Sequence, residues 1–189
     1  MTRVLGVVGS PRKNGNTHIL VSRILAGAEA QGAVTEQILL GDLTIRECDG
    51  CHACWQGKDC TKDDDMNGLY PRIAASDVIV FGTPVYWYGP TALMKAFVDR
   101  FVFFNCPENR KTLQGTSAVV AVPFEEDNPE TAALVLAFFR KCFEYLQMDL
   151  LGQIVVPGVT LRGEILKKED RLKEAHELGK RLAQSARRP

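Results

Sequence analysis

The sequence predicts an α/β protein in which a five-stranded parallel sheet is covered by helices on both faces. Apolar runs of strand length alternate with segments in which apolar residues recur at helical spacing. The first run, residues 3–9, is almost continuously apolar, as expected for a parallel strand that is buried on both faces. The length of 189 residues is typical of one domain. Right-handed crossovers between such strands give a doubly wound sheet.

The first half of the chain is expected to contain two strands and two helices. After the strand at 3–9, apolar residues at helical spacing predict a helix over 17–31, which Asn16 or Thr17 can cap. Residues 34–40 are the second expected strand. A short helix is expected over 66–75, and the acidic run Asp63–Asp65 before it complements the positive end of its dipole.

The second half is expected to contain three strands and three helices. The apolar runs at 77–82, 116–122 and 153–156 predict the strands, the last of them short. The expected helices cover 91–104, 131–147 and 168–186. The last helix is amphipathic, with one apolar side formed by Leu172, Ala175, Leu178, Leu182 and Ala186.

Charge and hydropathy exclude several classes of partner. Twenty-three basic residues balance twenty-three acidic ones, which argues against a nucleic acid or a membrane surface recognised by bulk charge. The apolar run at residues 4–9 is too short for a signal peptide or a membrane-spanning helix. We therefore expect a cytoplasmic protein, in which thiols stay reduced and clustered cysteines indicate metal or redox chemistry.

The turn after the first strand, residues 9–17, has the character of a phosphate-binding loop. Small and turn-forming residues lie directly before a helix, where backbone N–H groups and the helix dipole favour an anion. Ser10 and Thr17 can donate hydroxyl hydrogen bonds, Arg12 or Lys13 can neutralise a phosphate, and Asn16 can hold the turn. The spacing matches neither the Walker loop nor the dinucleotide fingerprint, and it suits one terminal phosphate better than a pyrophosphate.

The segment that follows the third strand, residues 82–90, is a second candidate binding element. It contains Pro84, Val85, Tyr86, Trp87 and Gly89, and its three consecutive aromatic residues cannot all pack inward. A flat ring system can stack on them. In a sheet of order 2-1-3-4-5 this loop and the loop after the first strand meet at the switch point, where ligands bind.

Four cysteines within thirteen residues form the third candidate site. Cys48, Cys51, Cys54 and Cys60 lie in an irregular segment at about 41–65, and a loop of that length in a compact domain is usually functional or disordered. Three interpretations stay open: an iron–sulfur cluster, a vacant or redox-active thiol loop, and zinc. In a cluster Cys60 would be the fourth ligand. Structural zinc usually takes two separated cysteine pairs, which the third closely spaced cysteine does not suit.

These motifs together resemble the flavodoxin-like NAD(P)H-dependent FMN reductase superfamily and, more narrowly, the iron–sulfur flavoproteins. The resemblance rests on Gly9–Arg12 with Gly15–Thr17, on Pro84–Trp87 with the helical residues 93–100, and on the compact cysteine run. It implies one flavodoxin-like domain over 1–189 with a five-stranded sheet of order 2-1-3-4-5 and a cysteine-rich insertion at about 41–65.

The resemblance also implies cofactors and partners. FMN would bind non-covalently to Ser10, Arg12, Asn16, Thr17, Pro84, Val85, Tyr86, Trp87 and Gly89. A [4Fe–4S] cluster would bind Cys48, Cys51, Cys54 and Cys60. Homodimers or homotetramers would bring the cluster of one subunit near the flavin of another, and NAD(P)H or a ferredoxin would be the redox partner. No catalytic side-chain acid or base is expected, because the cofactors carry the redox chemistry.

Two alternative functions remain open from the residues. One is a cluster-free NAD(P)H-dependent reductase of quinones, flavin or nitro compounds. The other is a non-catalytic interaction module that a zinc ion holds together, with the aromatic segment as its partner surface.

Overall fold

One five-stranded parallel sheet forms the centre of the molecule in the computed structural model, which describes residues 1–184. Its strands are β1 (Arg3–Val8), β2 (Val34–Leu39), β3 (Val78–Gly82), β4 (Ser117–Pro123) and β5 (Asp149–Val156). They lie in the order β2-β1-β3-β4-β5, and all neighbouring pairs are parallel. The predicted fold class and strand order are therefore confirmed.

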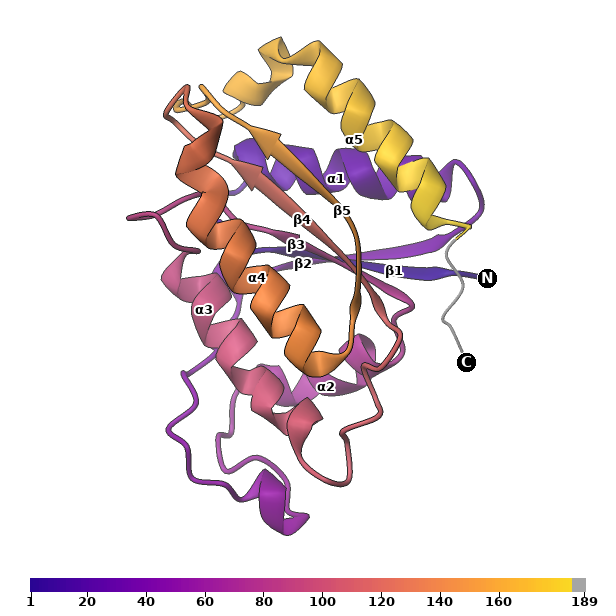
Figure 1. Ribbon diagram of the computed structural model, residues 1–189, viewed down its shortest axis with the longest axis vertical. Helices are drawn as coiled ribbons and strands as arrows, with labels where there is room; N and C mark the ends of the chain where they lie inside the picture. Colours follow the sequence, from indigo (N-terminus) through magenta and orange to yellow (C-terminus); the bar gives the residue numbers. More distant parts are fainter. Residues whose placement is uncertain (185–189) are drawn as a thin grey trace.

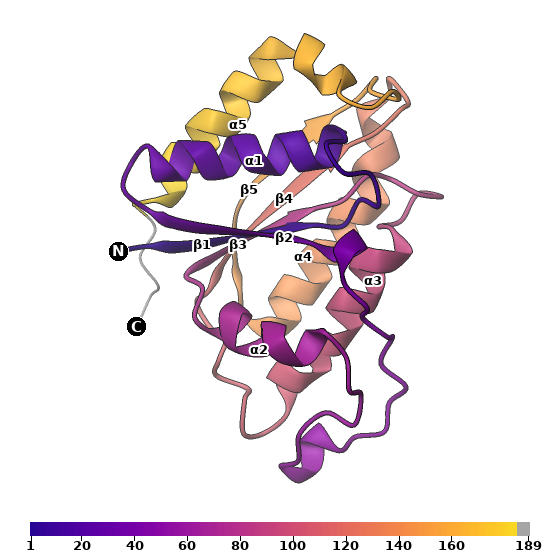
Figure 2. The same ribbon diagram turned by 180° about the vertical axis from the view of Figure 1, so that it is seen from behind.

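Helices cover both faces of the sheet (Figures 1 and 2). One face carries α1 (Asn16–Glu29) and α5 (Glu169–Leu182). The other face carries α2 (Met66–Ala74), α3 (Ala92–Asp99) and α4 (Ala133–Leu146). Short 3-10 helices occupy Leu40–Asp42, Cys54–Gln56, Arg100–Asn105, Pro129–Ala132 and Glu164–Lys167. Two helical layers around one sheet follow from strands that are apolar on both sides.

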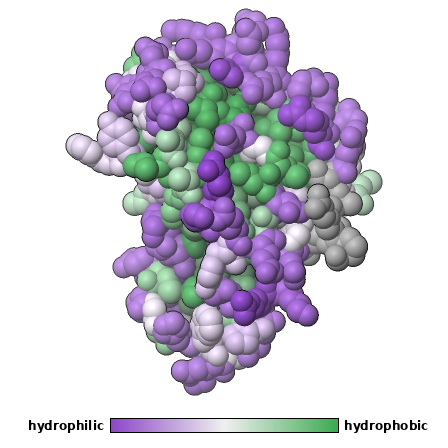
Figure 3. All heavy atoms as spheres, viewed as in Figure 1, coloured by the Kyte–Doolittle hydropathy of each residue, from purple (hydrophilic) through white to green (hydrophobic). Residues whose placement is uncertain are grey.

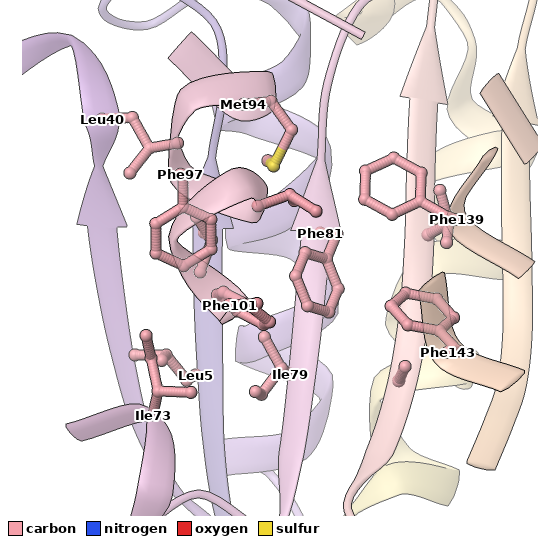
Figure 4. Packing of buried hydrophobic residues seen from close by; sticks show 14 of the residues in the cluster. Leu5, Leu40, Ile73, Ile79, Phe81, Met94, Phe97, Phe101, Phe139 and Phe143 are labelled. Carbon is pink, nitrogen blue, oxygen red and sulfur yellow. The ribbon is translucent and has the colours of Figure 1, made fainter. Parts of the chain in front are cut away.

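Two hydrophobic cores result, one on each face of the sheet. Side chains along a strand alternate between the faces, so Ile79 and Phe81 of β3 enter one core while Val78 and Val80 enter the other. The core beneath α2, α3 and α4 is rich in aromatic rings. Figure 4 shows Phe81 between the rings contributed by α3 and its extension and those contributed by α4. Phe81 lies 5.1 Å from Phe143, centroid to centroid.

Three element boundaries differ from those expected. The helix predicted over 91–104 ends at Asp99 and continues as a 3-10 helix to Asn105. The helix predicted over 131–147 begins with the 3-10 turn Pro129–Ala132. Strand β5 begins at Asp149 rather than at residue 153, because the first half of this edge strand is largely exposed and lacks the apolar run that marks a buried strand. Of the predicted helix 168–186, residues 185 and 186 lie outside the described residues.

The segment between β2 and α2 extends away from the sheet beyond the far end of α3 (Figures 1 and 2). It contains all four clustered cysteines, and its helical structure is limited to the two 3-10 turns Leu40–Asp42 and Cys54–Gln56. Within residues 1–184, no helix has the length and apolar character needed to cross a membrane.

We predict that the crossing of α1 and α5 depends on glycine. A Cβ atom on Gly179 would lie 1.9 Å from the carbonyl oxygen of Ile24, and one on Gly27 would lie 2.0 Å from that of His176. Because backbone atoms cannot move aside as a side-chain end can, Gly179→Ala should lower the free energy of unfolding by at least about 1–3 kcal/mol. Urea denaturation followed by circular dichroism measures this loss.

Gly68→Ala is the matched control. Gly68 lies in α2, and no atom lies within 4 Å of a Cβ placed there. Alanine should be neutral or stabilise this helix by up to about 1 kcal/mol. Equal stability of the Gly179→Ala variant and the wild type would contradict the proposed close crossing.

Candidate functional site

A pocket at the carboxyl ends of the strands is lined by four loops, and we call it the strand-end pocket. The loop after β1 contributes Ser10, Arg12, Asn16 and Thr17, and the loop after β3 contributes Pro84, Val85 and Tyr86. Parallel strands end at the same edge of a sheet, and the order β2-β1-β3 makes β1 and β3 neighbours. The structure therefore brings these predicted residues together, in the position where open α/β sheets bind ligands.

Direct hydrogen bonds join the loops after β1 and β3. The N–H of Gly9 donates to the carbonyl oxygen of Gly82 at 2.7 Å, and the Thr91 hydroxyl donates to the Gly9 carbonyl at 2.5 Å. A Cβ atom on Gly9 would lie 2.8 Å from Cβ of Met94, so only glycine allows α3 to approach this closely. The Thr91 hydroxyl also caps α3 by accepting from the N–H of Met94.

One end of the strand-end pocket has the chemistry of an anion site. Helix α1 begins there at Asn16, and its first N–H groups have no partners within the helix. The Thr17 side chain is 2% exposed, and its hydroxyl has no hydrogen-bond partner within residues 1–184. The Ser10 hydroxyl accepts from the N–H of Arg12 and keeps its own proton available. Uncommitted donors of this kind fit a phosphate.

Arg12 and Asn16 connect this loop to the chain between β5 and α5. The Arg12 guanidinium donates to the carbonyl oxygen of Thr160 at 3.0 Å. The Asn16 amide donates to the carbonyls of Val159 and Leu161 and accepts from the N–H of Ile165. Asn16 therefore holds the turn, as expected, but through a distant segment.

Lys13, the alternative cation of this loop, points elsewhere. Its ammonium group lies 2.8 Å from the carboxylate of Asp42, and it does not line the strand-end pocket. Of the two basic residues that the sequence offered for a phosphate, the structure places only Arg12 at the pocket.

The aromatic segment forms a tight turn that projects from the molecule between β3 and α3 (Figure 1). Tyr86 and Gly89 exchange two backbone hydrogen bonds, and Trp87 and Tyr88 between them have φ angles of 49° and 60°. Such positive φ values cost about 1–3 kcal/mol each outside glycine, and strain of this kind concentrates at functional sites. Trp87 is 97% exposed. Neither Trp87 nor Gly89 lines the strand-end pocket, although Tyr86 does.

Sequence reasoning missed the other wall of the strand-end pocket. Pro123 ends β4, Phe124 and Glu125 follow it, and Val159 and Thr160 follow β5. Their position at the carboxyl ends of two further strands is the feature that could have identified them. Glu125 and Arg12 are the two charged residues that line this pocket.

The four clustered cysteines line a second pocket, which we call the cysteine pocket. Cys48, Cys51, Cys54 and Cys60 all contribute to it, and each is a free thiol. The remaining lining residues are Asp49, Gly50, His52, Lys62, Tyr70, Arg100, Val102 and Phe103. The spacing that suggested a common site therefore does bring the four side chains around one cavity.

Polar contacts hold the two limbs of the cysteine segment together. The N–H groups of Thr44 and Arg46 donate to the carboxylates of Asp65 and Asp64 at 2.7 and 3.0 Å. The Lys62 ammonium pairs with Asp49 at 2.6 Å. These contacts give an irregular segment a defined shape without a strand or a long helix.

The inner wall of the cysteine pocket carries a buried ion pair. The side chains of Arg100 and Asp64 are each 1% exposed and lie 2.7 Å apart. Burial acts to raise the pKa of Asp64, but the hydrogen bonds from Arg100 and from the N–H groups of Arg46 and Met66 outweigh it, so this pKa lies below its usual value. Burial also raises the pKa of Tyr70, the ring over which Arg100 lies, so its hydroxyl stays protonated. The acidic run before α2 thus does more than complement a helix dipole.

The cysteine pocket offers four thiols as candidate metal ligands. In the described part of the chain, no three His, Cys, Asp or Glu side chains lie close enough together to hold one metal ion. Four thiolates are a donor set that either a zinc ion or an iron–sulfur cluster accepts, and a cubane takes each thiolate at a separate iron. Burial, with the neighbouring thiol of Cys106, raises the pKa of Cys54, so ligation there would release a proton.

Helix α3 separates the two pockets. Its capping residue Thr91 bonds to Gly9 at the strand-end pocket, and Arg100, which follows its last residue, lines the cysteine pocket. Its eight residues span about 12 Å at 1.5 Å per residue. The pockets share no lining residue.

Comparison with known proteins identifies similar chains. Residues 2–148 match the sequence model of a family described as NADPH-dependent FMN reductase. An iron–sulfur flavoprotein of Archaeoglobus fulgidus is 29% identical over 184 residues, which cover 97% of this chain and 80% of the relative. A putative NAD(P)H-dependent FMN-containing oxidoreductase of Bacillus subtilis is 27% identical over 185 residues, covering 95% and 97%.

A solved structure shares the fold. The FMN-dependent NADH-azoreductase of Bacillus anthracis, determined in complex with FMN, superposes with a TM-score of 0.71 at 15% identity. The superposition covers 96% of this chain and all of the other. At this identity the likeness concerns the fold alone.

We predict that Asn16 stabilises the strand-end pocket through its three bonds to the segment between β5 and α5. Asn16→Ala removes all three and should lower the free energy of unfolding by about 1–3 kcal/mol. Urea denaturation measures the change. Asn14→Gly in the same loop is the control, because Asn14 has a φ of 55° that glycine adopts readily. A loss of stability in the control as large as in Asn16→Ala would contradict the role given to the Asn16 amide.

Proposed function

This chain belongs to the NADPH-dependent FMN reductase family, and from that premise we propose that it is an FMN-dependent oxidoreductase whose four clustered cysteines carry a [4Fe–4S] cluster. The observation that carries the flavin part is the strand-end pocket, where the loops after β1 and β3 converge at the switch point of the sheet. The FMN-containing relative and the FMN-bound structure of the same fold support it.

We assign the phosphate of FMN to the start of α1. The N–H groups there, the Ser10 hydroxyl and the uncommitted Thr17 hydroxyl would donate to its oxygens. Arg12 would neutralise its charge, giving up or sharing its bond to the Thr160 carbonyl. Asn16, whose amide is fully occupied with backbone groups, would act by keeping the loop in shape.

We assign the flavin ring to the loop after β3. Pro84, Val85 and Tyr86 line the pocket, and so does Phe124 from the loop after β4. Gly89 would contribute by closing the turn that holds Tyr86. Trp87 is exposed outside the pocket, so it would contact a flavin in its own chain only from outside that pocket. FMN, when bound, accepts a pair of electrons from a donor such as NAD(P)H and can release them singly.

The cluster is assigned to the cysteine pocket by its chemistry. Four free thiols around one cavity match the all-thiolate ligation of iron–sulfur clusters. The similarity to an iron–sulfur flavoprotein over 97% of the chain supports this assignment. A [4Fe–4S] cluster, when bound, exchanges one electron at a time.

We propose a homo-oligomer on the arrangement of the two pockets. Within one chain they lie at opposite ends of α3, and a second subunit would offer a shorter path between a flavin and a cluster. Hydrophobic residues also gather on the face between α4 and α5, over the edge strand β5, as Figure 3 shows. Leu150 and Leu151 of that strand are exposed. Exposed apolar patches beside a free strand edge are typical of interfaces.

Neither alternative function is preferred. A cluster-free reductase would leave four cysteines lining one pocket without a role. A zinc-held interaction module would leave the strand-end pocket unused and does not agree with membership of an oxidoreductase family.

We predict that Arg12, and not Lys13, governs FMN affinity. Arg12→Ala removes one charge-assisted hydrogen bond to the phosphate, worth about 1.5–3 kcal/mol, so Kd should rise about 10- to 100-fold. Quenching of flavin fluorescence on titration of the flavin-free protein measures Kd. Lys13→Ala is the matched control and should change Kd by less than about threefold, because Lys13 pairs with Asp42 outside the pocket. A larger effect of Lys13→Ala than of Arg12→Ala would refute the assignment.

We predict that protein reconstituted with iron and sulfide without oxygen binds about four iron atoms and four sulfides per chain. Cys54→Ser should lose most of the iron and keep FMN, because the two pockets share no residue. Cys142→Ser is the control and should keep both, since Cys142 does not line the cysteine pocket. Wild-type protein that binds FMN but neither iron nor sulfide, and oxidises NAD(P)H as fast as Cys54→Ser does, would support the cluster-free reductase instead.

A further inference from the structure

Arg100 is a buried cation in the wall of the cysteine pocket that none of the assignments above uses. It follows the last residue of α3, its side chain is 1% exposed, and it is the largest fully buried side chain in the described part of the protein. A guanidinium group is rarely buried to this extent unless its donors are bound. Its hydrogen bonds therefore indicate what it does.

The donors of Arg100 point in two directions. Nη1 donates to the Asp64 carboxylate at 2.7 Å and to the Arg46 carbonyl at 3.0 Å. Nη2 donates to the sulfur of Cys60 at 3.2 Å. Nε is buried without a hydrogen-bond partner. Nη1 is thus committed to Asp64 and Arg46, Nη2 to the sulfur of Cys60, and the Nε–H is left as spare donor capacity.

Asp64 fixes the orientation of this cation. Its carboxylate accepts from Arg100 and also from the N–H groups of Arg46 and Met66 at 3.0 and 3.1 Å. These partners belong to the first limb of the cysteine segment and to the start of α2. A planar fork held in this way cannot turn from the sulfur without breaking the buried pair.

We propose that Arg100 is a positioning residue of the cysteine pocket: it orients Cys60 by donating to its sulfur, and its charge favours the reduced, more negative state of the cluster held there. The inference rests on the proposed cluster. N–H donors to ligand sulfur and nearby positive charge stabilise added negative charge and raise the reduction potential. Asp64 acts in the opposite sense, because its charge offsets that of Arg100.

The opposite signs of these charges separate tuning from a purely structural role. Arg100→Gln removes the cation and should make the midpoint potential more negative. Asp64→Asn removes the anion, leaves the cation, and should make the potential more positive. If the ion pair only held the segment in place, both substitutions would shift the midpoint potential in the same direction, because each breaks the same ion pair.

The experiment is a redox titration of the full-length protein, reconstituted with FMN, iron and sulfide, with the cluster followed by its visible absorption and by electron paramagnetic resonance. We expect Arg100→Gln to weaken the electron affinity of the cluster at least tenfold, which corresponds to about 59 mV for one electron. Arg100→Lys should restore part of the shift, since lysine keeps the charge and loses the fork. Lys62→Met is the control and should change the affinity by less than threefold. Lys62 lines the same pocket, but its ammonium donates to Asp49 and not to a cysteine sulfur, and water screens this pair because the Asp49 side chain is 51% exposed.

Each outcome decides the question. Shifts of opposite sign in Arg100→Gln and Asp64→Asn, with iron content and FMN content unchanged, support the inference. Iron-loaded variants with unchanged potentials, or with shifts of the same sign, overturn it and leave the proposed function intact. If Arg100→Gln holds no iron, Asp64→Asn decides alone, and only a positive shift supports the inference. A wild-type protein that binds FMN and no cluster overturns the inference together with the cluster assignment.

Discussion

Helix α3 is held at both ends by buried polar contacts, and the positions of both candidate sites depend on this. At its start, the Thr91 hydroxyl caps the helix and donates to the Gly9 carbonyl, which joins α3 to the loop after β1. After its end, Arg100 bonds to Asp64 and to the sulfur of Cys60. Between them, Met94 and Phe97 pack into the aromatic core over the sheet (Figure 4). The helix therefore sets the distance between the two pockets. Loss of the buried polar contact at either end would lower the stability of the protein.

In this arrangement the sheet and helices form a rigid scaffold, and irregular loops carry the residues of both candidate sites. The sheet and its two cores define one edge, and the loops at that edge carry the groups that suit a flavin phosphate and ring. The cysteine segment has almost no regular structure, yet carboxylates of Asp64 and Asp65 accept from its backbone and connect it to the start of α2. Under the proposed function, such outer contacts would restrict the cysteine segment before a metal arrives, which would favour binding.

The separation of the two pockets also bears on assembly. A cofactor at the strand-end pocket and one at the cysteine pocket would lie at opposite ends of α3 within one chain, which is the reason for the proposed homo-oligomer. The exposed aromatic turn at Trp87 and the apolar face over β5 are surfaces that such contact could cover (Figures 1 and 3). The strain in that turn, with Trp87 and Tyr88 both at positive φ, is retained although no internal packing requires Trp87 there.

The sequence alone determined the sheet and several of the segments that line the two pockets, because these depend on local patterns. Apolar runs identified all five strands, the polar loop after β1 and the aromatic loop after β3 were evident from their residues, and four closely spaced cysteines had to lie near one another. The wall formed by Phe124, Glu125 and Thr160 escaped notice, since their convergence depends on strands far apart in the chain. The bond from Arg100 to Cys60 was likewise decided only by the tertiary structure: forty residues separate the two, and nothing local shows that a helix end, an acidic run and a cysteine meet in one buried contact.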